Sequence, residues 1–374
     1  MIGIVGGGNI GTELAGELAY RGLEVCLFAK DVSNFNEKIK VNDIDKNISY
    51  IGTPKCITDS LTKLCNLCDT IIVTYPSNAF KYIKDELVES LKNKKGTKVV
   101  FMPGLGGVEF VFRDLVLNGS TIIGLQRVPA VYRLVVPGKE VMISGRRKEG
   151  LFAASIPAMK KGETKKIIEN LFQLKCEEIP NYLSVTLTPS NPLLHTSRLY
   201  SLFNKYEPDH IFSKNPLFYG EWNEDSSKLL IECDNELKNI KTKLKDIDLT
   251  FVESLLDHYE SIDIKSLTEK ISSICSLHNL NSPMIEVGEG QYKVDWSSRY
   301  FRADFPNGIV ILKAIAMLAH LETPAMDKII FWYQKQNEKQ YLLDKDTFGK
   351  DIAECNVPQN YGITTVEELE KYYK

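Results

Sequence analysis

The sequence predicts an α/β protein: an N-terminal doubly wound parallel sheet is followed by a mainly α-helical C-terminal domain. Three observations predict this. Strand and helix patterns alternate in the first half, a glycine-rich turn lies between the first strand and the first helix, and long helical patterns dominate after about residue 180. The 374 residues suit two domains, each large enough to bury its own core. We place these domains at 1–180 and 181–374.

The first elements form one strand–helix–strand unit. Residues 2–5 are a short apolar run typical of a buried strand, and apolar residues recur at helical spacing over 9–21 until Gly22 ends the pattern. Residues 23–29 are the second strand candidate. Two parallel strands joined by a helix are expected to form a right-handed βαβ unit.

The alternation continues along the first half. The next expected elements are a helix at 60–67, a strand at 70–75, a helix at 79–91, and strands at 98–102, 121–125 and 140–144. Such alternation implies a parallel sheet covered on both faces, and we expect the last two strands to extend it. In the second half we expect helices at 226–244, 251–259 and 310–321.

The turn after the first strand reads Gly6-x-Gly8-x-x-Gly11 and lies between a strand and a helix, which is the context that this fingerprint requires. Gly6 permits a tight turn, Gly8 lets the backbone approach a pyrophosphate, and Gly11 allows close packing of helix and strand. The helix N-terminus attracts the phosphate charge. The alternative is a glycine-rich turn without a ligand. We favour a Rossmann dinucleotide site that includes Gly6, Gly8, Asn9, Ile10 and Gly11.

The end of the second strand bears on the choice between NAD and NADP, because an acidic side chain there binds the ribose 2′-hydroxyl of NAD. This strand ends in Ala29-Lys30-Asp31. Lys30 could pair with a 2′-phosphate, whereas Asp31 lies one or two residues further along than the hydroxyl requires. We therefore favour NADP(H) as the cofactor. NAD(H), with Lys30 as a plain surface lysine, is the alternative.

Two later strand ends are expected to border the cofactor, because ligands bind at the carboxyl ends of parallel strands. They are 75–78, which begins Tyr75-Pro76-Ser77, and 103–107, which reads Pro-Gly-Leu-Gly-Gly. A purely structural turn is the alternative for each. We assign Tyr75, Pro76 and Ser77 to the wall of the cofactor site.

Composition and charge exclude several function classes. A formal net charge of −3 gives no electrostatic basis for binding nucleic acid or an anionic membrane. No apolar run approaches the ~20 residues that span a bilayer. The first residues include no basic segment before the apolar stretch, so we expect no signal peptide and a cytoplasmic protein.

The eight cysteines are scattered, and only Cys65 and Cys68 have the C-x-x-C spacing. A zinc site needs about four ligands, and no second pair accompanies these two. We therefore expect reduced thiols and no metal site. Metal or redox chemistry at this pair is the weaker alternative.

Two segments of the second half are rich in chemically useful residues: 191–198 (NPLLHTSR) and 299–308 (RYFRADFPNG). Hydride transfer to a carbonyl or imine needs a proton donor, a role that histidine suits near neutrality, so His195 is the candidate. A carboxylate on the other ring nitrogen would fix the tautomer, and an arginine suits a substrate carboxylate. Spacing alone does not pair His195 with Asp304, and a structural histidine is the alternative.

At these residues the chain resembles the opine dehydrogenase family of the octopine/nopaline type. The resemblance extends over nearly the whole chain: the glycine loop, N-P-x-x-H at 191–195 and R-Y-x-x-x-D at 299–304 occur in this order. Further segments that fit the family are Phe218–Trp222, Cys233–Glu236 and Tyr361–Thr365. Many dehydrogenases share the glycine loop, whereas the histidine and arginine/aspartate segments are more specific.

The resemblance implies roles for particular residues. His195 would be the catalytic histidine and Asp304 its partner carboxylate, while Arg299 would hold a carboxylate of the substrate. Asn191, the first residue of the histidine segment, and Arg133 would also bind substrate. For Arg133 a surface salt bridge is an equally good interpretation.

The resemblance also implies a reaction. The amine of an amino acid condenses with a 2-oxo acid such as pyruvate, and NAD(P)H reduces the imine to an N-(1-carboxyalkyl) amino acid. Both partners would be small molecules, and neither is identified, since Ala303 replaces an acidic residue of many family members. One alternative is a carbonyl reductase of the ketopantoate or glycerol-phosphate dehydrogenase type, which needs no amine. Another is a non-catalytic NADP(H)-binding sensor. Whether the chain forms a homodimer stays open.

Overall fold

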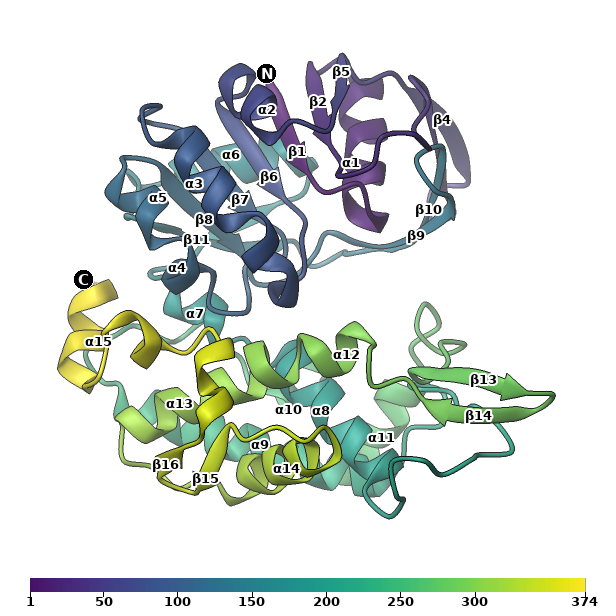
Figure 1. Ribbon diagram of the computed structural model, residues 1–374, viewed down its shortest axis with the longest axis vertical. Coiled ribbons are helices and arrows are strands. Elements are labelled where there is room, and N and C mark those ends of the chain that lie inside the picture. The colour runs from purple at the N-terminus through teal and green to yellow at the C-terminus, as the bar shows by residue number, and fades with distance from the viewer. Residues whose placement is uncertain (374) are drawn as a thin grey trace. The chain divides into compact units, whose positions relative to one another are not determined.

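The computed structural model describes residues 1–373, and the chain divides between Thr186 and Leu187 into two compact units (Figure 1). The boundary expected from the sequence lies slightly earlier, between 180 and 181. The intervening segment belongs to the first unit because Tyr182 is buried in it. The Tyr182 hydroxyl donates to the carbonyl oxygen of Gly104 at 3.1 Å, and its ring packs directly on Gly124.

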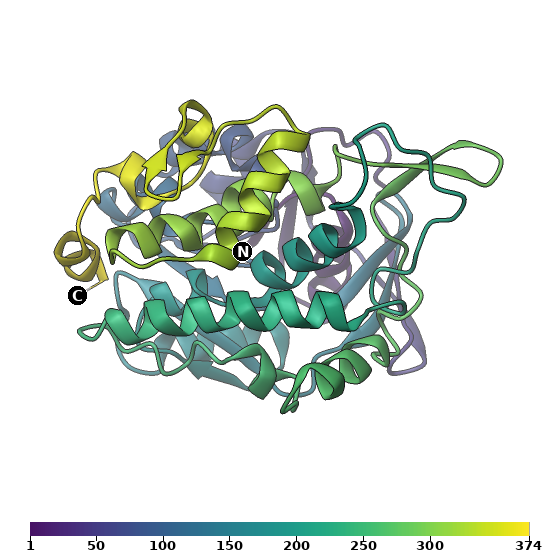
Figure 2. The ribbon, with the colours of Figure 1, turned by 90° about the horizontal axis from the view of Figure 1, so that it is seen from below.

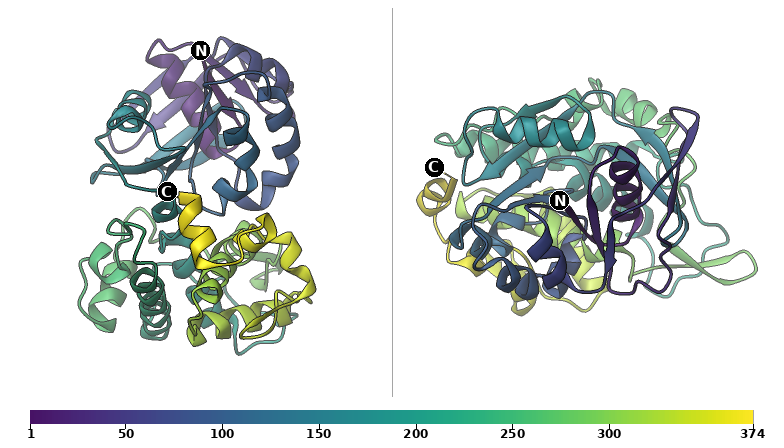
Figure 3. Two further views of the ribbon diagram at one scale, coloured as in Figure 1. Left: turned by 90° about the vertical axis from the view of Figure 1, so that its left-hand side faces the viewer. Right: turned by 90° about the horizontal axis from the view of Figure 1, so that it is seen from above.

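The N-terminal unit is built on an eight-stranded sheet in the order β12-β11-β8-β7-β6-β1-β2-β5 (Figure 3, right). All pairs in it are parallel except β11 with β8. The strands are β1 (Ile2–Val5), β2 (Val25–Phe28), β5 (Cys56–Thr58), β6 (Thr70–Val73), β7 (Lys98–Phe101), β8 (Thr121–Leu125), β11 (Leu151–Ile156) and β12 (Cys176–Glu178). The strand order reverses at β1, so the turn after β1 lies where ligands of such sheets bind. The predicted doubly wound Rossmann fold is confirmed.

Helices connect these strands and bury their apolar side chains. The helices are α1 (Asn9–Tyr20), α2 (Leu61–Leu67), η1 (Ser77–Tyr82), α3 (Lys84–Leu91), α4 (Val108–Val111), α5 (Arg113–Leu117), α6 (Glu163–Phe172) and α7 (Leu183–Thr186). The single helix expected at 79–91 is two elements, a short 3₁₀ segment and then α3. Leu14, Ala15 and Leu18 place the apolar face of α1 in the main core.

A second, four-stranded sheet covers α1 in the order β4-β3-β10-β9. Its strands are β3 (Ile39–Asp43), β4 (Ile48–Gly52), β9 (Ala130–Val136) and β10 (Glu140–Arg146). The prediction that residues 140–144 extend the parallel sheet is therefore wrong: β10 pairs with β3 and β9 instead. Contact with α1 is so close that a Cβ atom added to Gly52 would lie 1.9 Å from the carbonyl oxygen of Gly16.

The C-terminal unit is mainly helical, as predicted (Figure 2). Its helices are α8 (Ser190–Phe203), α9 (Glu224–Lys243), α10 (Leu255–His258), α11 (Ile264–Ser272), α12 (Arg299–Arg302), η2 (Phe305–Ile309), α13 (Val310–Leu318), α14 (Pro324–Gln336), η3 (Lys350–Glu354), η4 (Pro358–Tyr361) and α15 (Val366–Tyr373). Two hairpins complete it, β13 (Met284–Gly288) with β14 (Gln291–Val294), and β15 (Leu342–Asp344) with β16 (Thr347–Phe348).

One predicted helix of this unit is mostly a turn. The helix expected at 251–259 is reduced to α10, because the Ser254 side chain accepts a hydrogen bond from the backbone N–H of Asp257 and starts the helix there. The N-terminus of α9 is capped in the same way by Asn223, whose side chain accepts from the Ser226 N–H. Within residues 1–373, no helix combines the length and apolarity needed to cross a bilayer.

A buried group of charges lies between α1 and the second sheet. Arg146 of β10 donates to Glu17 of α1 at 2.7 Å and to Asp43 of β3 at 2.8 Å. Glu13 lies one turn before Glu17 and is 1% exposed. Burial, and then the neighbouring Glu17, hold the pKa of Glu13 well above its ordinary value. Glu13 is therefore a neutral acid in the folded protein, one turn from the Glu17 carboxylate that Arg146 binds.

This arrangement predicts how Glu13→Gln changes stability with pH. A raised folded-state pKa means that the folded protein binds more protons than the unfolded chain, so stability falls as pH rises from about 4.5 through that pKa. Glutamine mimics the neutral acid and cannot ionise. We expect the variant to match wild type in urea denaturation at pH 5 and to be the more stable protein at pH 9. The gain should be about 1.4 kcal/mol for each tenfold difference in proton affinity between the folded and unfolded states.

The matched control is Glu17→Gln. It removes the charge that Arg146 pairs with, so it should destabilise the protein at neutral pH. Equal stability of wild type and Glu13→Gln across the whole pH range would contradict a buried neutral Glu13.

Candidate active site

The glycine loop has the geometry that a dinucleotide requires. Gly6 has a φ of +120°, which favours glycine. A Cβ atom at Gly11 would lie 1.7 Å from the carbonyl oxygen of Gly6, so only glycine lets α1 start this close to β1. Gly8, by contrast, would place a Cβ atom in open space. The free N–H groups at the start of α1 and the open approach at Gly8 fit a bound pyrophosphate.

The other residues assigned to the cofactor differ in their surroundings. The Asn9 side chain accepts a hydrogen bond from the Leu134 N–H at 2.9 Å and so ties α1 to β9, while Ile10 packs against the core. Tyr75 follows β6 and lies beside the glycine loop, 3.2 Å from the position of a Cβ atom on Gly6. Next to it, Pro76 is exposed and Ser77 starts η1. Of these three residues, Tyr75 is the one that lies against Gly6.

The end of β2 carries positive charge. Lys30 is exposed, and its Nζ lies 4.7 Å from the centre of the Tyr82 ring. Asp31 turns back on its own chain: its carboxylate accepts a hydrogen bond from the Ser33 N–H, which lowers the pKa of Asp31. No acidic side chain therefore occupies the position directly after the strand.

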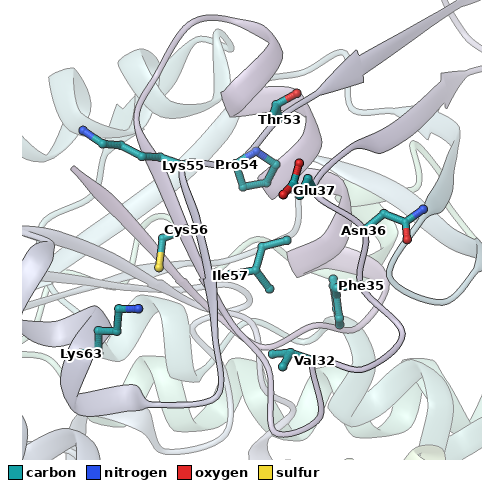
Figure 4. A pocket seen from close by; sticks show the side chains of 10 residues that line it. All are labelled: Val32, Phe35, Asn36, Glu37, Thr53, Pro54, Lys55, Cys56, Ile57 and Lys63. Atoms are coloured by element: carbon teal, nitrogen blue, oxygen red, sulfur yellow. The ribbon is translucent and has the colours of Figure 1, made fainter.

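A cavity of about 500 Å³ lies next to this strand end (Figure 4). It is bounded by the segment after β2 on one side and by the edge strand β5 on the other. Two lysines and one glutamate contribute charge to it. The lining residues are Val32, Phe35, Asn36, Glu37, Thr53, Pro54, Lys55, Cys56, Ile57 and Lys63.

In the helical unit, the structure brings His195 and Asp304 together. His195 lies in α8, is 5% exposed, and its Nδ1 is 2.8 Å from a carboxylate oxygen of Asp304, which is 109 residues away in sequence. Asp304 directly precedes η2, a widened helical turn in which the Ile309 N–H reaches back to the Asp304 carbonyl oxygen at 2.9 Å. Such turns are frequent at functional sites because they redirect nearby side chains.

The second ring nitrogen of His195 also has a partner. The hydroxyl of Tyr219 lies 2.9 Å from His195 Nε2. Tyr219 is buried, and this desolvation holds the pKa of its phenol well above the ordinary value, so the hydroxyl keeps its proton. Tyr219 was not predicted as a site residue. The only signal in the sequence was its place in the aromatic segment Phe218–Trp222.

Arg198 fixes the segment that carries Tyr219. It lies one turn after His195 on α8, is 1% exposed, and burial lowers its pKa to about 10. Its guanidinium makes four hydrogen bonds to this neighbourhood. The acceptors are the carbonyl oxygens of Leu217, Phe218 and Glu221 and the hydroxyl of Ser226. A fork of donors that binds successive carbonyl groups holds a loop more rigidly than a single bond would.

The remaining residues that were predicted to bind substrate lie on three different elements. Arg299 starts α12 and is exposed. Its positive charge lies close enough to Tyr219 to oppose the rise that burial causes in the pKa of the phenol. Asn191 lies one helical turn before His195 on α8. Arg133 lies on β9 of the other unit, where it donates to the Tyr132 carbonyl oxygen at 3.1 Å. Within residues 1–373 Arg133 forms no ion pair, so the structure gives no support to the salt-bridge interpretation.

The His195 site can accept and release a proton. A carboxylate only accepts hydrogen bonds, so Asp304 selects the tautomer with a proton on Nδ1 and leaves Nε2 as the basic nitrogen. The same carboxylate stabilises the imidazolium that forms when Nε2 takes up a proton. The pair therefore has the arrangement of a general base with its orienting group.

Comparison with known proteins identifies the helical unit. A family model described as NAD/NADP octopine/nopaline dehydrogenase, alpha-helical domain, matches residues 178–337. The N-terminus of NAD-dependent glycerol-3-phosphate dehydrogenase matches residues 1–110. Tauropine dehydrogenase of Arabella iricolor is 27% identical over 98% of both chains. The chain is similar to members of the opine dehydrogenase family over nearly its whole length.

Other relatives also match this chain over nearly its whole length. Octopine dehydrogenase of Pecten maximus is 26% identical over 98% of this chain and 97% of its own. The structure of octopine dehydrogenase with NADH and L-arginine has the same fold, with a TM-score of 0.84, 24% identity and coverage of 100% of this chain and 98% of its own. These similarities indicate that the protein is an NAD(P)-dependent oxidoreductase.

The cysteines of this protein are all free thiols. Cys65 and Cys68 are both buried, and Cys68 interacts with Cys26 of β2, which lowers the pKa of Cys68. Among residues 1–373, no three histidine, cysteine, aspartate or glutamate side chains are grouped so that they could hold a metal ion.

The glycine loop predicts different outcomes for two alanine variants. Gly8→Ala adds a methyl group in open space, so the fold should melt within about 2 °C of wild type, as expected of a surface substitution. The same methyl group would meet the pyrophosphate, so we expect the cofactor Kd, measured by NADPH fluorescence, to rise about tenfold or more, a loss of about 1.4 kcal/mol.

Gly11→Ala should lose both properties, because its methyl group overlaps the Gly6 carbonyl oxygen and separates α1 from β1. Unchanged cofactor affinity in Gly8→Ala would place the pyrophosphate elsewhere.

Proposed function

We propose that this protein catalyses the NAD(P)H-dependent reductive condensation of an amino acid amine with a pyruvate-like 2-oxo acid. The product is an N-(1-carboxyalkyl) amino acid, so the enzyme acts on a CH–NH bond. One observation carries the proposal: the His195–Asp304 bond lies in the unit that matches the helical domain of octopine/nopaline dehydrogenases. Condensation needs a base for the amine and an acid for the departing water, and this pair can serve as both.

The order of events follows from the chemistry of the substrates. An amino acid arrives as an ammonium ion, which cannot attack a carbonyl until it loses a proton. His195 takes up that proton, and Asp304 stabilises the resulting imidazolium. The imidazolium then protonates the carbinolamine hydroxyl, which leaves as water and gives the protonated imine (an iminium ion). The reduced nicotinamide, when bound, supplies the hydride that completes the reaction.

The proposed substrate contacts are charged and planar. Arg299 is assigned to a substrate carboxylate, because a guanidinium binds both oxygens of such a group. Its position five residues before Asp304, and the effect of its charge on Tyr219, support this assignment. Asn191 lies on the same helix as His195 and is assigned to a polar group of the substrate. Arg133 is assigned to a second carboxylate.

The relatives guide the choice of substrates. They are named tauropine, opine and octopine dehydrogenases, and solved structures of octopine dehydrogenase contain NADH with L-arginine, agmatine or pyruvate. These compounds support a test with pyruvate as oxo acid and with arginine and other amino acids, including the sulfonate taurine, as amines.

The proposal predicts that NADPH or NADH oxidation, followed by absorbance, requires both pyruvate and an amine. His195→Ala should lower kcat at least about 100-fold, because general acid–base catalysis contributes this much or more. Its affinity for the reduced cofactor, measured by fluorescence, should equal that of wild type, because His195 and the glycine loop belong to different units.

Other outcomes would favour the alternatives. Oxidation with the oxo acid alone would indicate a carbonyl reductase, for which the glycerol-3-phosphate dehydrogenase match of residues 1–110 is the specific observation. Cofactor binding without turnover of any amine and oxo acid pair would indicate a sensor. Full activity of His195→Ala would contradict the assigned role.

The preferred cofactor in this proposal is NADPH. The strand that would carry an acidic residue for NAD is followed by Lys30 instead, and Asp31 is bound to its own backbone. The adjacent cavity contains Lys63 in addition. Two lysines near the ribose favour a 2′-phosphate, because each can donate a charge-assisted hydrogen bond. NADH, which octopine dehydrogenase structures contain, is the competing cofactor.

This preference predicts a cofactor-specific effect of Lys30→Ala and Lys63→Ala. Each should raise KM for NADPH about tenfold, because a hydrogen bond to a charged group contributes about 1.5–3 kcal/mol. KM for NADH should change less than about twofold, since NADH lacks the phosphate. Lys92→Ala, which removes an exposed lysine of the same unit, is the control. Equal effects on both cofactors would contradict the assignment.

We assign the reaction to the cytoplasm. All eight cysteines are free thiols, which is typical of proteins in a reducing compartment. Reduced nicotinamide and 2-oxo acids are also the reactants that the proposed reaction consumes.

A further inference from the structure

One polar group of the site has no part in the mechanism above. The Tyr219 hydroxyl occupies the only ring nitrogen of His195 that Asp304 leaves available. A base whose nitrogen is already bonded cannot take a proton directly from a substrate in this arrangement. The proton must pass through the group that holds the nitrogen, or that group must first move away.

The directions of the hydrogen bonds follow from the chemistry of the three side chains. Asp304 accepts, so His195 donates from Nδ1. Nε2 then has a lone pair and accepts, so the Tyr219 hydroxyl is the donor. The phenolic oxygen retains its own lone pairs, which can accept a hydrogen bond from a further donor. An ammonium group is such a donor.

Burial keeps Tyr219 in this role and in this place. Desolvation holds the pKa of the phenol well above its ordinary value, so free phenolate does not accumulate and the hydroxyl gives up its proton only as it receives another. Tyr219 is 5% exposed. The carbonyl groups of Leu217 and Phe218 are bonded to the buried Arg198, so a satisfied buried network holds the backbone that carries the Tyr219 ring.

We infer that Tyr219 is the proton-transfer group that meets the substrate amine, and that it relays the proton to His195. This inference rests on the proposed function. The N–H bond of the ammonium group breaks, its electron pair stays on nitrogen, and the proton goes to the Tyr219 oxygen. At the same time the Tyr219 proton moves to His195 Nε2. Tyr219 is unchanged at the end, and the imidazolium paired with Asp304 holds the proton for the departing hydroxyl.

Arg198 is a positioning residue in this account. It contacts neither ring nitrogen of His195. Through three hydrogen bonds to carbonyl oxygens it holds the segment 217–221 next to α8, the helix that carries both Arg198 and His195. The ring of Tyr300, whose centre is 4.5 Å from that of the His195 ring, packs against the same group. The relay distance of 2.9 Å is thereby set by buried contacts.

The test is Tyr219→Phe, which removes one oxygen atom and keeps the ring. With pyruvate and the best amine at pH 7, we expect kcat/KM for the amine to fall about 10- to 100-fold, within the range of a lost proton-transfer group. The deficit should shrink as the pH passes the pKa of the free amino acid's ammonium group, because a substrate that arrives deprotonated does not need the relay. Tyr200→Phe, a hydroxyl deletion on α8 itself, is the matched control and should keep wild-type kcat/KM.

A second measurement does not depend on turnover. Nitrogen-15 NMR of the histidine side chains reports whether Nε2 of His195 accepts a hydrogen bond, and His195→Gln assigns the signal. The Nε2 resonance should change in Tyr219→Phe and stay in place in Tyr200→Phe. An unchanged resonance would overturn the inference, as would an activity deficit that is constant at every pH, which indicates a structural role.

The two proposals fail in different ways. If wild type does not require an amine, the proposed function is wrong, and the relay is wrong with it. If wild type requires an amine and Tyr219→Phe matches wild type at pH 7, the proposed function survives and only the relay is wrong.

Discussion

The hydrogen bond between His195 and Asp304 is the contact around which the candidate active site of the helical unit is arranged. It joins side chains that are 109 residues apart in the sequence, so α8 and the start of η2 must lie next to each other in the fold. α8 supplies a buried histidine in its second turn, and the widened turn η2 supplies the carboxylate at its start. Asp304 is the residue at which this turn begins, because its carbonyl oxygen accepts the hydrogen bond from the Ile309 N–H.

The polar residues around this bond are satisfied almost entirely within the unit. Arg198 is among the largest fully buried side chains of the protein, and backbone carbonyl groups take up most of its donors. A buried guanidinium with fewer partners would cost far more than it contributes. The chain therefore places a charged anchor one turn from His195 only because the segment 217–221 offers several acceptors at once. Rigidity of that segment is the direct consequence.

Sequence patterns predicted the structure correctly where a pattern has one structural meaning. Continuous apolar strands that alternate with helices can only be buried from both sides, so the parallel sheet and its glycine loop were predictable. β10 was assigned to the wrong sheet because an isolated strand does not encode its neighbours. The pairing of His195 with Asp304 came from resemblance, since spacing does not pair residues so distant. Tyr219 was missed because its partner is fixed by the packing of Arg198, which no local pattern records.

The second sheet explains how α1 is held in position after the glycine loop. α1 must present its first N–H groups to a phosphate, yet its start has no side-chain cap of its own. Asn9 binds the backbone of β9 instead, and Glu17, near the other end of the helix, binds Arg146 of β10. Both ends of α1 are thus attached to adjacent strands of one sheet. The Glu13 side chain between them is buried and neutral, so α1 packs against this sheet without an unpaired charge at this position.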